Sequence, residues 1–308
     1  STSIQELKLA SEAAGTRILL NNLPGSAVAI AAAITLSKGN YLFLLGDKEE
    51  AAYLYSDLAN LLPETEVLFF PSSFKRSIQY GNADPSSIIQ RTGVLSNLKL
   101  AQRAAGESQL LIVSYPEAIA EKIPAQEQMD KNTLVLSVGE KITITFIVEI
   151  LQEHWFERVD FVFEPGQFSV RGGIVDGFSY SNSRPYRIDF FGDEVESIRE
   201  FNIETQLSDS KVGKIAIVPH VSAGLEGERM VALMTYLDSN THVWLKDGAL
   251  FSEKIDSIFQ LTEESREPSE ESKGWKHKGG VLITEKEFRN TISSLSLVEF
   301  GQHPIDKG

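Results

Sequence analysis

The sequence predicts an α/β protein built on a parallel β-sheet. Short apolar runs typical of buried strands alternate with longer stretches of helical periodicity. Strands that alternate with helices in this way are typical of a parallel sheet whose two faces are covered. A length of 308 residues also leaves room for a second domain with its own core.

The first part of the chain, residues 1–126, supplies most of the predicted sheet. Asp84 is placed to cap a helix that has Pro85 at its first position, and residues 71–83 are a connection. A boundary is expected near Pro124, after a short helix that leaves the sheet. The predicted strands cover 17–21, 41–45, 66–70 and 109–113, and the predicted helices cover 4–14, 27–36, 48–62 and 85–100.

Residues 127–207 are predicted to form a small α+β domain, and residues 208–308 to return to the first domain. The small domain begins with a strand over 134–138 and a helix over 142–153 whose apolar stripe is expected to lie in the core. The polar, charged stretch 262–280 is expected to be a loop in which Trp275 could stack on a base. The returning segment is predicted to contain strands over 214–218 and 241–245, a helix over 227–237, and apolar runs over 281–284 and 295–300.

Composition excludes several classes of function. The net charge of −14 disfavours broad binding to the phosphates of DNA. The absence of cysteine excludes disulfides and thiolate metal sites, and the five histidines lack the spacing of metal ligands. The longest apolar run is too short to span a membrane. A cytoplasmic protein without a metal is therefore expected.

The stretch 161–201 carries the pattern of a hairpin with one charged face. Two predicted strands, 167–178 and 185–191, are joined by a polar connection, and Gly172-Gly173 in the first indicates a bulge or a close backbone approach. Alternation places Arg171, Arg187, Asp189 and Phe191 on one outer surface, typical of a partner-binding patch. The alternative is that Phe191 bends inward at the following glycine and the charges are ordinary solvated residues.

The first strand-loop-helix is where a phosphate-binding loop would lie in such a sheet. That chemistry needs the order GxxxxGK[ST], whereas this chain has Gly25 and Ser26 at the loop and Val28 and Ala29 where lysine and hydroxyl are required. Without these groups phosphoryl transfer loses most of its charge compensation. The segment is interpreted as a degenerate nucleotide loop with no catalytic residues, and Asp247 after a later strand is expected to cap the next residue.

Two segments, EPGQFSVRGGIVD and YRIDFFGDEVESIREFN, resemble a signature of the excision-repair protein UvrB and, more closely, of the transcription-repair coupling factors (Mfd). The resemblance implies a degenerate helicase-like (RecA-like) domain, 1–126 with 208–308, carrying an inserted UvrA-binding domain, 127–207. The connection 71–83 is too short for the DNA-clamping hairpin that the UvrB family inserts there.

The resemblance also implies a set of UvrA-contact residues. The arginines of the two motifs fall on Arg171 and Arg187, the aromatic on Phe191 and the acidic position on Asp189, which is expected to orient Arg187 or accept a cation of the partner. Ser169 departs from UvrB, which has an arginine at that position, so one ionic contact is expected to be missing.

The chain is expected to be a piece of a longer protein. The resemblance implies a parent that is an ATP-driven DNA translocase displacing stalled RNA polymerase, with ATP and magnesium bound only in motor domains beyond Gly308, and none in this chain. Two alternatives stay open. One is an active UvrB-type ATPase that recognises damage, and the other is an autoinhibitory role in which a C-terminal domain of the parent covers the UvrA surface.

Overall fold

The computed structural model describes residues 16–20, 23, 25–37, 39–73, 84–103, 109–154, 156–182, 184–218, 229–264 and 282–305. The chain divides into two compact units, Ser1–Ile123 with Met230–Gly308, and Pro124–Arg229. Several expected features lie outside the described residues: the helix over 4–14, the connection 71–83 beyond residue 73, and the stretch 262–280 beyond residue 264 with Trp275.

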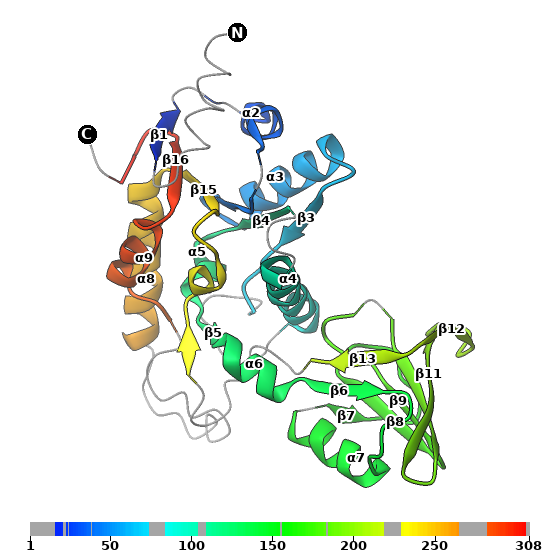
Figure 1. The fold of residues 1–308 in the computed structure, drawn as a ribbon. Helices are drawn as coiled ribbons and strands as arrows, with labels where there is room; N and C mark the ends of the chain where they lie inside the picture. Colours follow the sequence, from blue (N-terminus) through cyan, green and yellow to red (C-terminus); the bar gives the residue numbers. More distant parts are fainter. Residues whose placement is uncertain are drawn as a thin grey trace. The chain divides into compact units, whose positions relative to one another are not determined.

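The first unit is built on a parallel sheet with the strand order β1-β16-β15-β2-β4-β3 (Figure 1). The four middle strands are buried along nearly their whole length, as expected for a sheet covered on both faces. The predicted α/β class is therefore confirmed. The strands are β1 (Arg17–Leu20), β2 (Tyr41–Leu44), β3 (Glu66–Phe69), β4 (Leu110–Ser114), β15 (His242–Lys246) and β16 (Ser296–Phe300).

Helices of the first unit begin where the sequence supplies caps. Asp47 accepts a hydrogen bond from the Glu50 amide at the start of α3, and Thr284 and Glu287 form a capping box at the start of α9. Helix α2 packs on α3, while α8 packs on α5 and α9. The helices are α2 (Ala27–Thr35), α3 (Lys48–Leu61), α4 (Pro85–Arg103), α5 (Pro116–Ala120), α8 (Gly248–Glu264) and α9 (Glu285–Ile292).

The second unit contains a six-stranded sheet of order β12-β11-β10-β9-β8-β7, antiparallel except for the β7–β8 pair. A separate pair, β6 (Leu134–Ser137) and β13 (Lys214–Ile217), and the helices α6 (Gln126–Asn132) and α7 (Ile144–Glu153) complete it. Helix α7 buries Ile147 and Leu151, in agreement with its predicted core stripe. The strands of the sheet are β7 (Glu157–Arg158), β8 (Gln167–Arg171), β9 (Ile174–Gly177), β10 (Tyr186–Phe191), β11 (Glu194–Phe201) and β12 (Ser208–Val212).

Two expectations about chain organisation differ from the structure. The chain does not rejoin the first unit at residue 208, because β12 pairs with β11 and β13 pairs with β6. The polar sequence of β12 resembles a turn, yet it forms an exposed edge strand. The helix expected over 227–237 is replaced, in its described part, by β14 (Met230–Val231) and a 3-10 turn, Leu233–Tyr236. Strand β5 (Ile123–Pro124) follows α5.

None of the helices within the described ranges has the length and apolar character needed to cross a bilayer.

A buried ion pair stabilises the first unit. Arg91 of α4 and Glu121 are 1% and 5% exposed, and a guanidinium nitrogen lies 3.2 Å from the carboxylate. Ser72 and Ser73 donate their hydroxyls to the same carboxylate at 2.5 and 2.6 Å, and Ser73 adds its amide. Burial lowers the pKa of Arg91, partly offset by the charge of Glu121. A buried charge with its partners in place is tolerated, but one left alone is costly.

We expect Glu121→Gln to lower the free energy of unfolding by about 3 kcal/mol, because it leaves the Arg91 cation buried without its counter-charge. Urea unfolding of the wild type and the variant measures this loss. Glu285→Gln is the matched control, since Glu285 pairs with Arg289 in an exposed i,i+4 geometry. The control should cost less than about 1 kcal/mol. Equal losses in the two variants would contradict the assigned role of Glu121.

Candidate partner-binding surface

The register of the small unit's sheet brings four predicted residues to one face. Arg187 of β10 lies opposite Asp176 of β9, and Asp189 lies opposite Ile174, which in turn lies opposite Arg171 of β8. Along β10 the burial pattern alternates, with Tyr186, Ile188 and Phe190 buried. The predicted alternation is therefore confirmed, and Arg171, Arg187, Asp189 and Phe191 project from the opposite side of the sheet.

Two glycine turns shape the end of this face. Gly172 and Gly192 both have positive φ, +61° and +62°, and each is the first residue of a two-residue hairpin turn, as in type II′ turns. Gly172-Gly173 is thus a hairpin turn between β8 and β9 rather than a bulge in one strand. The expected close backbone approach is present at Gly173, whose carbonyl accepts the Phe190 amide at 2.8 Å. Phe191, just before Gly192, is 79% exposed. It does not bend inward, so the alternative interpretation of Phe191 is wrong.

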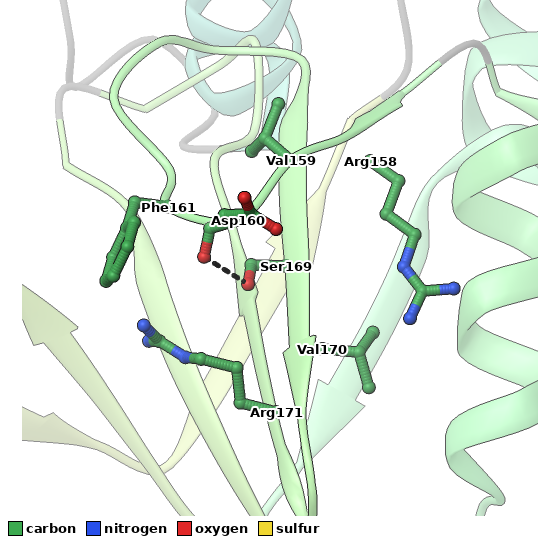
Figure 2. Close-up of a pocket in the computed structure, with 7 residues that line it drawn as sticks. All are labelled: Arg158, Val159, Asp160, Phe161, Ser169, Val170 and Arg171. Carbon is green, nitrogen blue, oxygen red and sulfur yellow. Dashed lines mark hydrogen bonds between the residues drawn. The ribbon is translucent and has the colours of Figure 1, made fainter.

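Arg171 lies at the edge of the face and is partly accessible. Its side chain is 38% exposed and its guanidinium lies 5.2 Å from the centre of the Phe161 ring (Figure 2). This distance is within the range of a cation–π contact. Arg171 also donates to Asp176, so the side chain is held from two sides and still contacts solvent.

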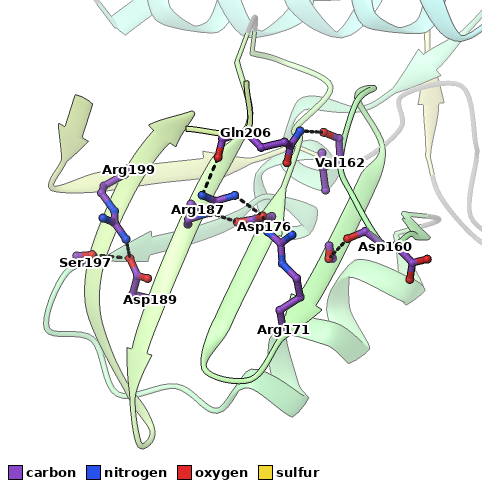
Figure 3. Close-up of polar contacts among 10 residues, drawn as sticks. Asp160, Val162, Arg171, Asp176, Arg187, Asp189, Ser197, Arg199 and Gln206 are labelled. Carbon is purple, nitrogen blue, oxygen red and sulfur yellow. Dashed lines mark hydrogen bonds and ion pairs between the residues drawn. The ribbon is translucent and has the colours of Figure 1, made fainter. Parts of the chain in front are cut away.

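Asp176 is the centre of the charged network (Figure 3). Its side chain is 1% exposed, and Arg187 binds it through two hydrogen bonds of 2.8 Å, Nε to Oδ1 and Nη2 to Oδ2. Arg187 donates a third bond to the Gln206 carbonyl, 3.1 Å, and lies 4.6 Å from the centre of the Phe201 ring. The hydrogen bonds to Asp176 raise the pKa of Arg187 despite its partial burial. Arg187 is only 14% exposed, so its position is set within the unit.

Asp189 does not pair with Arg187 as expected. Its carboxylate accepts hydrogen bonds from the Ser197 hydroxyl at 2.7 Å and from Arg199 at 2.5 Å, both on the neighbouring strand β11. The reason is the register, which sets Asp176 of β9 opposite Arg187 and Ser197 of β11 opposite Asp189. Asp176 therefore orients Arg187, and Asp189 is neutralised by Arg199.

Sequence reasoning missed Asp176, Arg199, Phe161 and the Gln206 carbonyl. Asp176 could have been found, because it has the same outward parity as Ile174 in a strand whose alternate residue, Val175, is buried. Gln206 has φ +58° and lies in a turn that no spacing rule would have placed beside Arg187. Ser169 is buried, and its hydroxyl donates to the Asp160 carbonyl at 2.9 Å.

The expected degenerate nucleotide loop is described at residues 23, 25 and 26 and at the start of α2. Gly25 has φ +53°, and Ser26 at the start of α2 makes no side-chain cap hydrogen bond. Val28 is 6% exposed and Ala29 is fully buried, so both pack in the core. Within the described ranges, histidine and acidic side chains form no cluster of three that could hold a metal ion.

Asp247, at the end of β15, has a role different from the expected cap of Gly248. Its carboxylate accepts the amides of Gln302 and His303 at 2.6 and 2.9 Å. Burial acts to raise the pKa of Asp247, but these hydrogen bonds outweigh it and the pKa is lowered. Asp247 therefore fixes the loop that follows β16.

Comparison with known proteins matches residues 134–222 to the family described as the UvrB interaction domain. The chain is also similar to proteins named transcription-repair-coupling factor. The relative from Bacillus subtilis is 31% identical over 74% of this chain and 19% of its own length, that from Rickettsia bellii 30% over 59% and 16%, and that from Escherichia coli 25% over 67% and 18%. The chain thus spans about a fifth of the relatives that it matches. Residues 134–222 are therefore similar to the UvrB interaction domain, and the chain is similar to the transcription-repair-coupling factors over most of its length.

Proposed function

We propose that this chain is a recruitment module that binds the excision-repair protein UvrA through the outer face of the small unit. The observation that carries the proposal is the row of Arg171, Arg187 and Phe191 on one sheet face, inside the segment that matches the UvrB interaction domain. Arginine and aromatic side chains are the residues that most often dominate interface energies.

The charges of this face fit an acidic partner. Arg171 and Arg187 share the single carboxylate of Asp176, which leaves the trio with one excess positive charge. Asp189 and Arg199 neutralise each other beside it. A partner carboxylate would complete the charge balance by accepting the guanidinium N–H groups that Asp176 and Gln206 do not use.

The geometry also favours recognition through fixed arginines. Long side chains normally lose conformational freedom on binding, which weakens association. Asp176 has already fixed Arg187, and the Phe161 ring and Asp176 constrain Arg171. Phe191 is the complementary part of the site, an exposed ring that supplies apolar contact area.

The activities beyond UvrA binding are proposed for a longer protein of the kind that the relatives represent. In our proposal, that protein couples stalled transcription to repair in the cytoplasm, and its own motor domains use ATP and magnesium to move on DNA and displace RNA polymerase. Another domain of the same protein covers the docking face until recruitment is required. The chain described here supplies the UvrA contact and no ATPase activity.

Phe191→Ala should weaken binding to UvrA by about 2 kcal/mol, roughly thirtyfold, because the variant removes the exposed aromatic contact area of the proposed interface. Calorimetric titration with purified UvrA measures the change. Phe146→Ala on α7 is the matched control, since Phe146 is also exposed, at 49%, but lies off the charged face. Unchanged affinity for Phe191→Ala would rule out the assigned role of that ring.

Asp176→Asn should weaken the same interaction although Asp176 itself is too buried to touch a partner. The variant removes the charge that orients both arginines, and we also expect it to lower the free energy of unfolding by about 2 kcal/mol. Thermal melting and titration with UvrA separate the two effects. Asp209→Asn is the control, because its pair with Arg184 is about half exposed on both sides. If Asp176→Asn bound UvrA as tightly as the wild type, preorganisation by Asp176 would be excluded.

The isolated chain should show no ATP hydrolysis above buffer in the presence of magnesium. Phosphoryl transfer would need a lysine and a hydroxyl in this loop. The chain has Val28 and Ala29 at those positions, and both are buried in apolar packing. A coupled-enzyme assay for ADP measures the activity. Hydrolysis that Ser26→Asp abolishes would instead support the alternative of an active UvrB-type ATPase, since a negative charge at the exposed start of α2 would repel phosphate.

A further inference from the structure

The sheet of the small unit has an open edge beside the proposed docking face. Strand β7 is two residues long and pairs only with Gln167 and Phe168 of β8. Within the described chain, no strand pairs with Ser169–Arg171 on the side away from β9. Figure 2 shows this stretch of β8 beside the segment that follows β7. An unpaired strand edge is a template for another extended chain.

The hydrogen-bond pattern between β8 and β9 shows that the backbone N–H and C=O groups of Val170 face the open edge. The Phe178 amide donates to the Gln167 carbonyl, so this pair is hydrogen-bonded across the hairpin. Such pairs alternate in an antiparallel ladder, which makes Val170 and Val175 a pair without mutual hydrogen bonds. The N–H and C=O groups of Val170 therefore point away from β9, toward the open edge. Along that edge, the last backbone hydrogen bond before Val170 runs from the Val159 amide to the Phe168 carbonyl, at 2.9 Å.

A cleft of about 610 Å³ lies along this edge, and its lining is cationic and partly apolar. It includes Arg158, Phe161, Val170 and Arg171, with Asp160 as its acidic member. Figure 2 shows Phe161 and Arg171 on one side of β8 and Arg158 on the other side with Val170. Phe161 is 50% exposed, and Arg158 is exposed and has no described ion-pair partner. An excess of positive charge here contrasts with the chain's net charge of −14.

We propose that an extended acidic segment of the partner pairs with β8 at Val170 and occupies this cleft. Successive side chains of an added strand point to opposite sides, so acidic side chains on either side would meet Arg171 or Arg158. Backbone bonds to Val170 fix the register, and the arginines select the charge. This inference rests on the proposed function, because the segment belongs to the protein that docks on the neighbouring face, and it adds strand pairing to the side-chain contacts described above.

Val170→Pro tests the backbone contact. Proline removes the N–H that faces the open edge, while the ladder with β9 loses no hydrogen bond, because Val170 makes none to that strand. We expect Val170→Pro to weaken binding to purified UvrA about fivefold or more, the effect of one lost hydrogen bond, and Val170→Ala to bind nearly as the wild type. Arg158→Glu should weaken binding as well, whereas the control Lys131→Glu on α6 should not.

The outcomes separate the two proposals. If Phe191→Ala weakens binding and Val170→Pro does not, the edge pairing is wrong and the recruitment function stands. If the wild type does not bind UvrA, the recruitment function itself fails and this inference fails with it. Equal weakening by Val170→Pro and Val170→Ala would assign the effect to the side chain and overturn the pairing. A chain that is dimeric by light scattering and becomes monomeric on Val170→Pro would show that a second copy occupies the edge instead.

Amide exchange keeps the proposal testable if Val170→Pro fails to fold, which thermal melting would reveal. In the wild type, the Val170 amide should exchange rapidly when the chain is free and at least tenfold more slowly in the UvrA complex. The Arg171 amide, which faces β9, should change little. An exchange rate of the Val170 amide that is the same in both states would overturn the inference.

Discussion

The outer face of the small unit depends on the burial of one carboxylate. Asp176 is almost completely removed from water, and such a charge is tolerated only when it is paired and hydrogen-bonded. Two guanidinium groups supply that compensation, one of them through a pair of parallel hydrogen bonds. The positions of Arg171 and Arg187 thus follow from the need to neutralise Asp176, and the shape of the face follows from theirs.

In this arrangement, the groups that hold the guanidinium of Arg187 in place differ from the group outside that would bind it. Asp176 and the Gln206 carbonyl fix Arg187 in place, while the remaining N–H groups stay available to a carboxylate from outside. Because one carboxylate serves two cations, the trio keeps an excess positive charge. Phe191 has a different character, since a ring that is 79% exposed contributes apolar area without being part of the network. The face therefore combines rigid cations with an exposed aromatic side chain, the composition typical of interface centres.

The sequence was sufficient for the parts of the structure that depend on local periodicity. Alternation placed Arg171, Arg187, Asp189 and Phe191 on one face, because the side-chain period of a strand is fixed by backbone geometry. It could not identify the partners of these residues, since pairing depends on which residues stand opposite each other across strands. The register sets Asp176 opposite Arg187 and Ser197 opposite Asp189, and Asp189 also pairs with Arg199 of the same neighbouring strand.

The errors in chain organisation have similar causes. Residues 208–212 have the polar composition of a turn, and only their pairing with β11 makes them a strand. The residues expected as a helix over 227–237 form a short strand and a 3-10 turn in their described part, where tertiary pairing outweighs a weak helical pattern. Gly172-Gly173 marks a turn rather than a bulge for the same reason, because the strands on its two sides pair with each other.

The first unit shows why fold class alone does not assign an activity. A parallel sheet with helices on both faces is a common scaffold for nucleotide hydrolysis, yet chemistry requires specific groups at the loop before α2. At that position Val28 and Ala29 are part of the core, where each contributes to packing and neither can reach an anion. An apolar side chain that is already buried cannot be recruited to bind phosphate without unpacking the helix. Charged and aromatic groups held in fixed positions and partly exposed lie on the face organised by Asp176, within the described residues.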